Sequence, residues 1–377
     1  MSGIGTDSRN ALGSGVAQLG DLPLESGQIL PRAQVAYRSW GRLNASGTNA
    51  VLVLHALTGD QHAGGSGGWW EKLIGPGRAL DTERCFVLCP AILGGCSGST
   101  GPASPAEDSR PWGSRFPRLS IRDTVTAEAM LAEQLGIRRF ALVAGGSLGG
   151  ARAAEWAVSR PGLVARCAVI AANAALTAQQ LGWCRTQELA IRQDPHFAGG
   201  DYYGGPGPQQ GLGLARQIAH LTYRSEAELE RRFGRELQEA AGTGPGHRPV
   251  PFQIESYLAH QGCKLAARFD ANAYLTVNGI LASHDLGRGR GGVRAALART
   301  RCAWILAAVE TDQLFLPEQM HLFSRALPEP VPVHTLRSSC GHDGFLLETD
   351  QLAPILSSAL SAPGHGRPRP GRRGQGA

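Results

Sequence analysis

Several patterns that would assign a chain to a broad class of proteins are missing from these 377 residues. No apolar run approaches the roughly 18 residues that a membrane-spanning helix needs, and the polar segment 1–15 lacks the apolar core of a secretory signal. The eight cysteines form no C-x-x-C pair, which argues against a zinc ribbon or a thioredoxin-like site. Neither an H-E-x-x-H nor a Walker A pattern occurs. We therefore expect a cytoplasmic protein with reduced thiols, without a membrane anchor or a bound metal.

Acidic residues are absent from the C-terminal segment 362–377, which contains four arginines. These arginines account for most of the net charge of +6, so the rest of the chain carries about +2. Because the segment is rich in proline and glycine, it cannot build a hydrophobic core. We expect a disordered basic tail over 362–377, a flexible N-terminus over 1–16, and no specific nucleic-acid partner.

Six short apolar runs along the chain are typical of buried strands. They lie at residues 50–55, 85–92, 140–144, 167–172, 303–309 and 331–336. Helix-like segments at 121–135 and 151–159 separate several of them. Strands that alternate with helices predict an α/β fold with a mostly parallel central sheet.

The alternation of strands and helices stops between the fourth and the fifth apolar run. Five candidate helices occupy this part, at 176–193, 211–221, 226–240, 251–259 and 271–283. Glycine- and proline-rich breaks separate them. We predict a helical lid over 175–299, inserted into a core made of 17–174 and 300–361.

The apolar run 140–144 leads into the pentapeptide Gly145-Gly146-Ser147-Leu148-Gly149. A G-x-S-x-G sequence between a strand and a helix is the nucleophile-elbow pattern, a tight turn that presents a serine hydroxyl. With 51 glycines in the chain, the alternative is a glycine-rich turn with an idle serine. A base and an acid that suit the serine favour the first interpretation.

A serine becomes a nucleophile when a base takes its proton and a third group orients that base. In proteins with a nucleophile elbow of this kind, the chain order is serine, acid, histidine. Asp312 follows the late strand 303–309, and His342 follows the last one, 331–336. We predict a triad of Ser147, Asp312 and His342. Glu310 is the competing acid, and the alternative roles for Asp312 are an N-cap of a helix near Pro317 or a simple turn residue.

Stabilisation of a developing oxyanion needs backbone N–H groups. The residue after the nucleophile, Leu148, provides one candidate. Leu57, in the loop after the strand 50–55, provides the other, with Thr58 beside it as a further candidate for substrate contact.

Two further sequence patterns bear on ligand binding. Arg216 and Tyr223 are seven residues apart, so they share a face of the predicted helix and could hold a carboxylate; the alternative is an exposed arginine over a packed tyrosine. The glycines at 287, 289 and 292 match G-x-G-x-x-G. Since no apolar strand precedes them, we do not expect a dinucleotide site.

The chain resembles the homoserine O-acetyltransferase family of the alpha/beta-hydrolase superfamily over about residues 22–355. The motifs that carry the resemblance are His55-Ala-Leu-Thr-Gly-Asp60, Gly68-Trp-Trp70, Leu73-Ile-Gly-Pro-Gly77, Leu93-Gly-Gly-Cys-Ser-Gly-Ser-Thr-Gly-Pro102, Gly145-Gly-Ser-Leu-Gly-Gly150, Ala154-Glu-Trp-Ala157, Ala219-His-Leu-Thr-Tyr-Arg-Ser225, Glu255-Ser-Tyr-Leu258, Arg268-Phe-Asp-Ala-Asn272 and Gly341-His-Asp-Gly-Phe345. Leu148 stands where many members have methionine, a volume-conserving change. The arginine-rich tail lies outside the family pattern.

The resemblance implies an alpha/beta-hydrolase fold and transfer of an acetyl group from acetyl-CoA to the hydroxyl of L-homoserine, a step toward methionine. It implies that Ser147 is acylated, that Arg216 and Tyr223 contact the substrate carboxylate, and that Asp343 contacts its amino group. It also implies a homodimer built through the lid and no cofactor besides acetyl-CoA as co-substrate. The alternatives are a succinyl donor, a serine acceptor, or an esterase. The first two stay open because one methylene changes the binding free energy by only about 1–3 kcal/mol.

Overall fold

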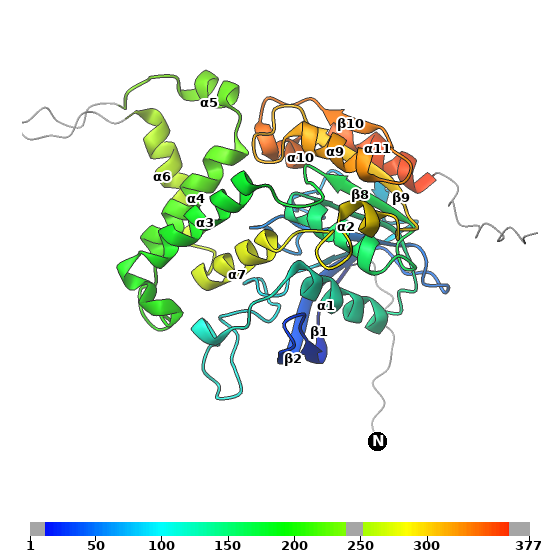
Figure 1. Cartoon of the computed structure of the whole chain (residues 1–377), viewed down its shortest axis with the longest axis horizontal. Helices are drawn as coiled ribbons and strands as arrows, with labels where there is room; N and C mark the ends of the chain where they lie inside the picture. Colours follow the sequence, from blue (N-terminus) through cyan, green and yellow to red (C-terminus); the bar gives the residue numbers. More distant parts are fainter. Residues whose placement is uncertain (1–11, 239–251, 362–377) are drawn as a thin grey trace, which may run out of the picture.

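An eight-stranded sheet forms the centre of the protein, whose computed structural model describes residues 12–238 and 252–361 (Figure 1). The strands, in spatial order, are β1 (Leu12–Pro23), β2 (Ile29–Trp40), β6 (Phe86–Pro90), β3 (Ala50–Leu54), β7 (Phe140–Gly146), β8 (Arg166–Ile170), β9 (Ala303–Val309) and β10 (Val333–Leu336). From β6 to β10 all neighbouring strands are parallel, whereas β1 and β2 are antiparallel. The mostly parallel sheet expected from the sequence is therefore confirmed.

All six apolar runs contain a strand of this sheet, but the hairpin of β1 and β2 was missed. Exposed and buried residues interchange along β2, because this hairpin forms the antiparallel edge of the sheet and meets water on one side. Such strands do not produce a continuous apolar run. The flexible N-terminus predicted over 1–16 needs a correction: residues 12–16 pair with residues 36–40 of β2, and the remaining residues lie outside the described part.

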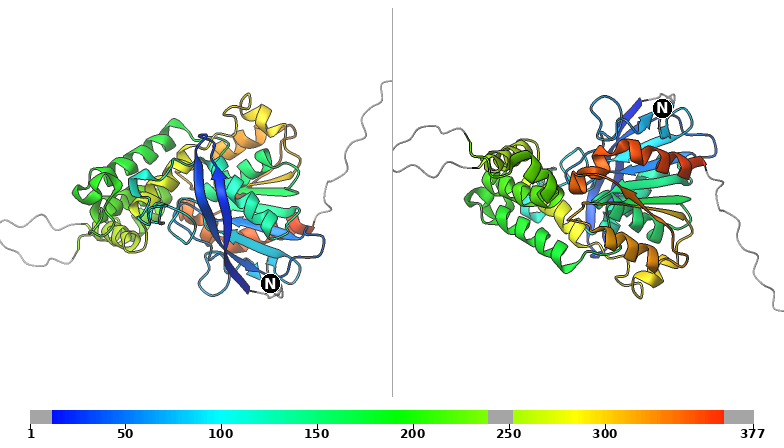
Figure 2. Two further views of the ribbon diagram at one scale, coloured as in Figure 1. Left: turned by 90° about the horizontal axis from the view of Figure 1, so that it is seen from below. Right: turned by 90° about the horizontal axis from the view of Figure 1, so that it is seen from above.

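Helices cover both faces of the sheet and bury two hydrophobic clusters. On one face lie α1 (Ile121–Gln134), α2 (Leu148–Ser159) and α9 (Pro317–Ala326), together with the short α8 (Val293–Leu297). On the other face α11 (Thr349–Ser361) packs beside the segment that contains the two-residue strands β4 (Ile74–Gly75) and β5 (Leu80–Asp81). Figure 2 shows the sheet between these layers.

The chain between β8 and β9 forms a group of helices at one side of the sheet (Figure 1, green and yellow). They are α3 (Ala178–Arg192), α4 (Gln209–Tyr223), α5 (Glu226–Phe233), α6 (Gln253–Ala266) and α7 (Ala271–Ala282). All five predicted helices exist, although α5 ends earlier and α6 ends later than expected. The exact limits proposed for core and lid stay a prediction, and the tail 362–377 lies outside the described residues.

Capping residues explain where several helices begin. Ser120 and Thr177 each form a capping box with the residue three positions on, at the starts of α1 and α3. Asp270 accepts a hydrogen bond from the backbone N–H of Ala273 at the start of α7. Across the described residues no helix combines the length and the apolar character that crossing a membrane requires.

A close crossing of α4 and α6 fixes the lid. A Cβ added at Gly262 would lie 2.8 Å from the carbonyl oxygen of Gly213 and 3.2 Å from the Gln217 side-chain nitrogen. Gly262 therefore lets the two backbones approach each other.

We expect Gly262→Ala to lower the free energy of unfolding by about 1–3 kcal/mol through overpacking. Gly182→Ala, inside α3, is the matched control, because nothing lies within 4 Å of its added Cβ. The control should be neutral or stabilising by up to about 1 kcal/mol. Denaturant unfolding of both variants measures the difference, and equal effects would contradict the crossing as the cause.

Candidate active site

Ser147 occupies a strained turn between β7 and α2. Its backbone has φ +58° and ψ −127°, a conformation that L-residues rarely adopt. The N–H of Ser147 donates to the carbonyl of Ile170 at 3.0 Å, and its carbonyl accepts from the N–H of Ala151, so both sides of the turn are held. The predicted nucleophile elbow is thus present as a strand, a turn and a helix.

The glycines of the pentapeptide are needed because backbones meet at this turn. A Cβ on Gly149 would lie 2.0 Å from the Leu54 carbonyl oxygen, and one on Gly145 would lie 2.4 Å from the carbonyl carbon of Gly149. The start of α2 is therefore packed against the end of β3. This contact places Ser147 beside the loop that contains Leu57.

Asp312 and His342 form a buried hydrogen bond, with 2.7 Å between Asp312 Oδ2 and His342 Nδ1. The other oxygen of Asp312 accepts from the N–H groups of Leu314 and Phe315 at 2.8 and 2.9 Å, which fixes the carboxylate. The Nε2 atom of His342 is buried and has no hydrogen-bond partner in the described part of the chain. His342 is thus oriented by one ring nitrogen and has the other one available.

The alternatives for the acid are resolved by these contacts. Glu310 accepts from the N–H of Ser338 at 3.1 Å and, within the described residues, forms no hydrogen bond or ion pair with His342. The helix α9 begins after Leu316 and has no side-chain cap, so Asp312 does not serve as its cap. Asp312 orders its own turn and pairs with His342.

Three aromatic rings surround the His342 imidazole. Phe315 stacks on it and Phe345 meets it edge-on, each with 5.4 Å between ring centroids, and Tyr223 lies at 5.8 Å. Phe345 also lies against the nucleophile turn, because a Cβ on Gly146 would come within 2.2 Å of its ring. One ring therefore separates the residue before Ser147 from His342. This places the predicted nucleophile and base in one site.

Burial and charge act in opposite directions on His342. Burial by itself lowers the pKa of His342, because the charged imidazolium is disfavoured away from water. The charge and hydrogen bond of Asp312, with the charge of Asp343, outweigh it and raise the pKa of His342 above its ordinary value. The imidazole of His342 therefore binds a proton more tightly in this site than in water, which suits its predicted role as a base.

His55 holds the loop after β3, a role that the sequence analysis missed. The Ile92 N–H donates to His55 Nε2 at 3.0 Å, so the proton is on Nδ1, which donates to the Ala56 carbonyl at 2.8 Å. Burial, aided by the charge of Arg152, lowers the pKa of His55 to about 3 and keeps the ring neutral. The ring joins the loop that contains Leu57 to the end of β6.

A buried ion pair lies beneath this loop. Arg152 on α2 pairs with Glu128 on α1, and both side chains are almost fully buried. Arg152 also donates to the His55 carbonyl at 3.4 Å, and the Trp156 indole donates to Glu128 at 2.6 Å. Hydrogen bonds from several donors offset the cost of burying these charges.

The two candidate oxyanion donors lie on either side of the turn. Leu148 is the first residue of α2, so its N–H has no partner within the helix. Leu57 is buried in the loop after β3. Within the described residues, neither N–H forms a backbone hydrogen bond. Both are therefore available to an anion formed near Ser147.

The predicted substrate contacts lie on the lid side of His342. Arg216 and Tyr223 share a face of α4 as expected, with 5.3 Å between the guanidinium carbon and the ring centroid. Burial raises the pKa of Tyr223 to about 12, so its hydroxyl stays protonated. Asp343 follows His342 and forms an ion pair with Arg224 at 3.1 Å, which the sequence analysis did not predict. Thr58 presents its carbonyl to Arg268 at 3.1 Å.

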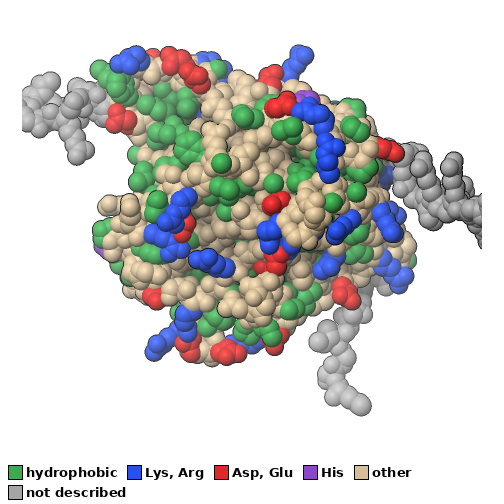
Figure 3. All heavy atoms as spheres, in the orientation of Figure 1, with side chains coloured by type: hydrophobic (Ala, Val, Ile, Leu, Met, Phe, Trp, Pro, Cys, Tyr) green, Lys and Arg blue, Asp and Glu red, His purple; other side chains and the backbone are tan. Residues whose placement is uncertain are grey.

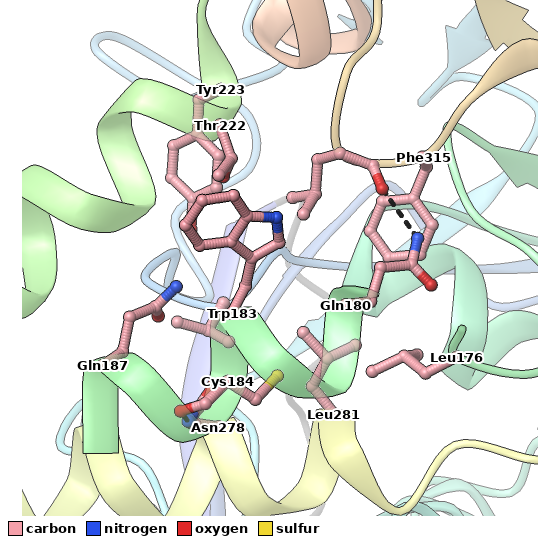
Figure 4. Close-up of a pocket in the computed structure, with 12 residues that line it drawn as sticks. Leu176, Gln180, Trp183, Cys184, Gln187, Thr222, Tyr223, Asn278, Leu281 and Phe315 are labelled. Atoms are coloured by element: carbon pink, nitrogen blue, oxygen red, sulfur yellow. Dashed lines mark hydrogen bonds between the residues drawn. The ribbon is translucent and has the colours of Figure 1, made fainter. Parts of the chain in front are cut away.

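A narrow pocket adjoins these residues (Figure 4). Its lining comes from the Leu57 loop, from the lid helices, and from the turn after β9: Leu57, Leu176, Gln180, Trp183, Cys184, Gln187, Thr222, Tyr223, Asn278, Leu281, Leu314 and Phe315. The indole of Trp183 stands in the middle of this lining. The pocket is mostly apolar and approaches His342 through Tyr223 and Phe315. In residues 12–238 and 252–361, no three His, Cys, Asp or Glu side chains are grouped as a metal site would need.

A strained serine, an oriented histidine and a buried aspartate on this sheet define an alpha/beta-hydrolase-type protein. A family model described as alpha/beta hydrolase fold matches residues 49–349. The chain is also 50% identical over 349 residues to the homoserine O-acetyltransferase of Thermobifida fusca (strain YX), covering 90% of this chain and 91% of that relative. The chain therefore belongs to the homoserine O-acetyltransferase family within the alpha/beta-hydrolase fold.

Solved structures support the fold. The homoserine O-acetyltransferase from Bacillus anthracis superposes with a TM-score of 0.87 at 24% identity, over 95% of this chain and all of that one. The acetyl esterase MekB superposes with a TM-score of 0.79 at 27% identity, over 93% of this chain and 97% of that one. The same fold thus occurs in a transferase and in an esterase.

We expect Asp312→Asn to lower the pKa of His342, because it removes the negative charge that raises this pKa. An NMR titration of the His342 ring measures this, with exposed His321 on α9 as the internal control. An unchanged pKa of His342 would contradict the pairing.

The same variant has a stability effect of defined sign. Because the folded pKa is raised, the stabilisation is present below the ordinary value of about 6.5 and is lost as pH rises through the folded pKa. The deficit in the free energy of unfolding of Asp312→Asn should therefore be larger in mild acid than in mild alkali.

Proposed function

We propose that this chain transfers an acetyl group from acetyl-CoA to the hydroxyl of L-homoserine, as a step in methionine biosynthesis. The observation that carries the proposal is the 50% identity to a homoserine O-acetyltransferase over 90% of the chain. The geometry of the Asp312–His342 pair beside the Ser147 turn suits the chemistry. We propose that these three residues form the catalytic triad.

In the first half-reaction, His342 Nε2 takes the proton of the Ser147 hydroxyl while Ser147 Oγ attacks the thioester carbonyl. The N–H groups of Leu57 and Leu148 stabilise the oxyanion. The carbon–sulfur bond then breaks, and the CoA thiolate takes the proton from His342. Asp312 stabilises the imidazolium between these steps. The product is an acetyl ester on Ser147.

In the second half-reaction, His342 takes the hydroxyl proton of homoserine, whose oxygen attacks the acetyl ester. The ester bond to Ser147 breaks, and His342 returns the proton to Ser147 Oγ. A covalent intermediate of this kind gives ping-pong kinetics. The proposed chemistry needs no metal and no cofactor besides acetyl-CoA as co-substrate.

The acceptor is held by groups on the lid side of the base. We propose that Arg216 and the Tyr223 hydroxyl bind its carboxylate and that Asp343 binds its ammonium. Arg216 forms no ion pair with another described residue, which leaves its guanidinium available. We also propose a substrate contact for Thr58, which follows Leu57 in the same loop. An amino-acid acceptor held in this way also displaces water from the ester.

Three alternatives differ in substrate while using the same serine chemistry: a succinyl donor, a serine acceptor, or hydrolysis. The likeness to the acetyl esterase MekB makes hydrolysis the specific competitor. The guanidinium of Arg216 and the carboxylate of Asp343 favour an amino-acid acceptor, which carries one group of each opposite charge, since a simple ester requires neither contact. An acetyl and a succinyl donor differ in the size of the acyl group, and this difference separates the remaining transferase alternatives.

The first test is thiol release from acetyl-CoA or succinyl-CoA, each with L-homoserine, L-serine or no acceptor. We expect fast release only with acetyl-CoA and homoserine, and a loss of roughly 10³-fold or more in Ser147→Ala. A preference for succinyl-CoA or serine would change the substrate but keep the mechanism. Equal release without an acceptor would identify a hydrolase.

Arg216→Lys should raise the KM for homoserine by roughly tenfold or more, because an ammonium replaces a two-pronged contact with a carboxylate. The KM for acetyl-CoA should change little. Arg185→Lys, on the exposed side of α3, is the matched control. Equal changes in both KM values would place Arg216 outside the acceptor site.

We also propose a homodimer built through the lid and a cytoplasmic location. Exposed leucines on α3 and α4 support the dimer, and they are Leu181, Leu189, Leu214 and Leu221. Figure 3 shows hydrophobic side chains gathered over the lid end of the molecule. Leu214 and Leu221 are seven residues apart and therefore share one face of α4.

A further inference from the structure

Arg224 lies between α4 and α5, directly beside the residue after His342. Its Nη2 atom is 3.1 Å from Asp343 Oδ2, and its Nη1 atom donates to both oxygens of Glu228 at 3.0 and 3.2 Å. Two carboxylates therefore contact one guanidinium. Arg216, on α4, forms no ion pair with any described residue. The guanidinium of Arg216 is thus available to a substrate, whereas that of Arg224 is already paired with carboxylates of the protein.

The backbone around Arg224 is clamped to the segment that contains His342. A Cβ on Gly341 would lie 2.7 Å from the Tyr223 carbonyl oxygen and 2.7 Å from the Ser225 nitrogen. The Ser225 hydroxyl donates to the carbonyl of Ser339. The junction of α4 and α5 therefore packs directly on the short helix η3 (Gly341–Asp343). A displacement of Arg224 would therefore also displace the Asp343 carboxylate.

Charges from three elements face the Asp343 carboxylate. Burial raises its pKa, and nearby Glu228 adds to this, whereas Arg224, His342 and Arg216 lower it, with Arg224 the strongest of the three. The net result is a raised pKa of Asp343. Burial thus works against the ionised form that an ammonium contact needs, and Arg224 is the main group that opposes it.

We propose that Arg224 is a positioning residue, which holds the Asp343 carboxylate in place and charged so that it can receive the ammonium group of the acceptor. The inference rests on the proposed function, because it requires an amino-acid acceptor. Arg224 is not itself a substrate contact, since its two terminal nitrogens are engaged by Asp343 and Glu228. It acts on the acceptor through Asp343.

The test compares Arg224→Gln with Arg231→Gln, which removes an exposed arginine on α5 that is 3.4 Å from the Ser339 hydroxyl. The assay is acetyl transfer from acetyl-CoA to L-homoserine. We expect Arg224→Gln to raise the KM for homoserine roughly 10- to 100-fold. The burst of thiol release from acetyl-CoA without acceptor should stay within about threefold, because Asp343 takes part in no proton transfer of the acylation step and affects His342 only through its charge, less than Asp312 does. Arg231→Gln should leave both values unchanged.

A pH profile separates positioning from a general loss of structure. Without Arg224, Asp343 takes up a proton at higher pH, so the loss in kcat/KM for homoserine should be larger near pH 6 than near pH 8.5. In the Asp343→Asn background, removal of Arg224 should have little further effect, because the two act as a unit. Arg224→Lys, which keeps the charge, should recover part of the affinity for homoserine.

The outcomes distinguish the two proposals. Absence of transfer to homoserine by the unaltered chain would overturn the proposed function. Normal transfer by that chain, with an unchanged KM for homoserine in Arg224→Gln, would overturn the role of Arg224 alone. A pH-independent fall in both half-reactions, or full additivity with Asp343→Asn, would show a merely structural role. Should Arg224→Gln fail to fold, Arg224→Lys gives a milder form of the same KM and pH comparison, and an unchanged KM for homoserine together with an unchanged pH profile in that variant would overturn the role of Arg224.

Discussion

The buried hydrogen bond between Asp312 and His342 is the interaction on which the site depends. It joins the loops after β9 and β10, and it is held from both ends by backbone donors and by aromatic rings. Its strength comes from the surroundings, because a charge-assisted hydrogen bond gains from removal of water. The same burial would drive His342 to the neutral form if Asp312 were absent. Orientation and basicity of the histidine therefore have one source.

Close backbone contacts bring the nucleophile to this pair. Gly149 lets α2 touch the end of β3, and Gly146 leaves room for Phe345, which also contacts His342. The neutral ring of His55 and the buried pair beneath it hold the facing loop. The core thus supplies a rigid frame, whose parts are fixed by glycines and by fully bonded polar groups rather than by the lid.

The lid contributes charge and enclosure. Its helix α4 ends at Tyr223, whose ring lies 5.8 Å from the imidazole of His342, measured between ring centroids. The next residue, Arg224, pairs with Asp343. Helices α3 and α7 complete the pocket around Trp183. The core thus contributes the Ser147 turn and the Asp312–His342 pair, and the lid contributes the Tyr223 and Arg224 side chains beside them.

Local pattern was enough to predict much of this arrangement. The strands β3 and β6–β10 are apolar runs because both their faces are covered, and Ser147 is marked by its glycines. Asp312 and His342 were selected by chain order after late strands, and the structure brings them into contact. The hairpin of β1 and β2 escaped prediction because it is an edge with one wet face.

The sequence by itself determined the strands of the parallel core, the turn at Ser147 and the places of Asp312 and His342 after late strands, since each of these is marked by residues close together in the chain. Tertiary structure alone decided the partners of those groups. The bond from Ile92 to His55 joins residues 37 positions apart, and the contacts of Tyr223 with His342 and of Arg224 with Asp343 each join residues more than 100 positions apart. No local periodicity records such contacts, because they arise only when loops from separate strands and the lid meet at one edge of the sheet.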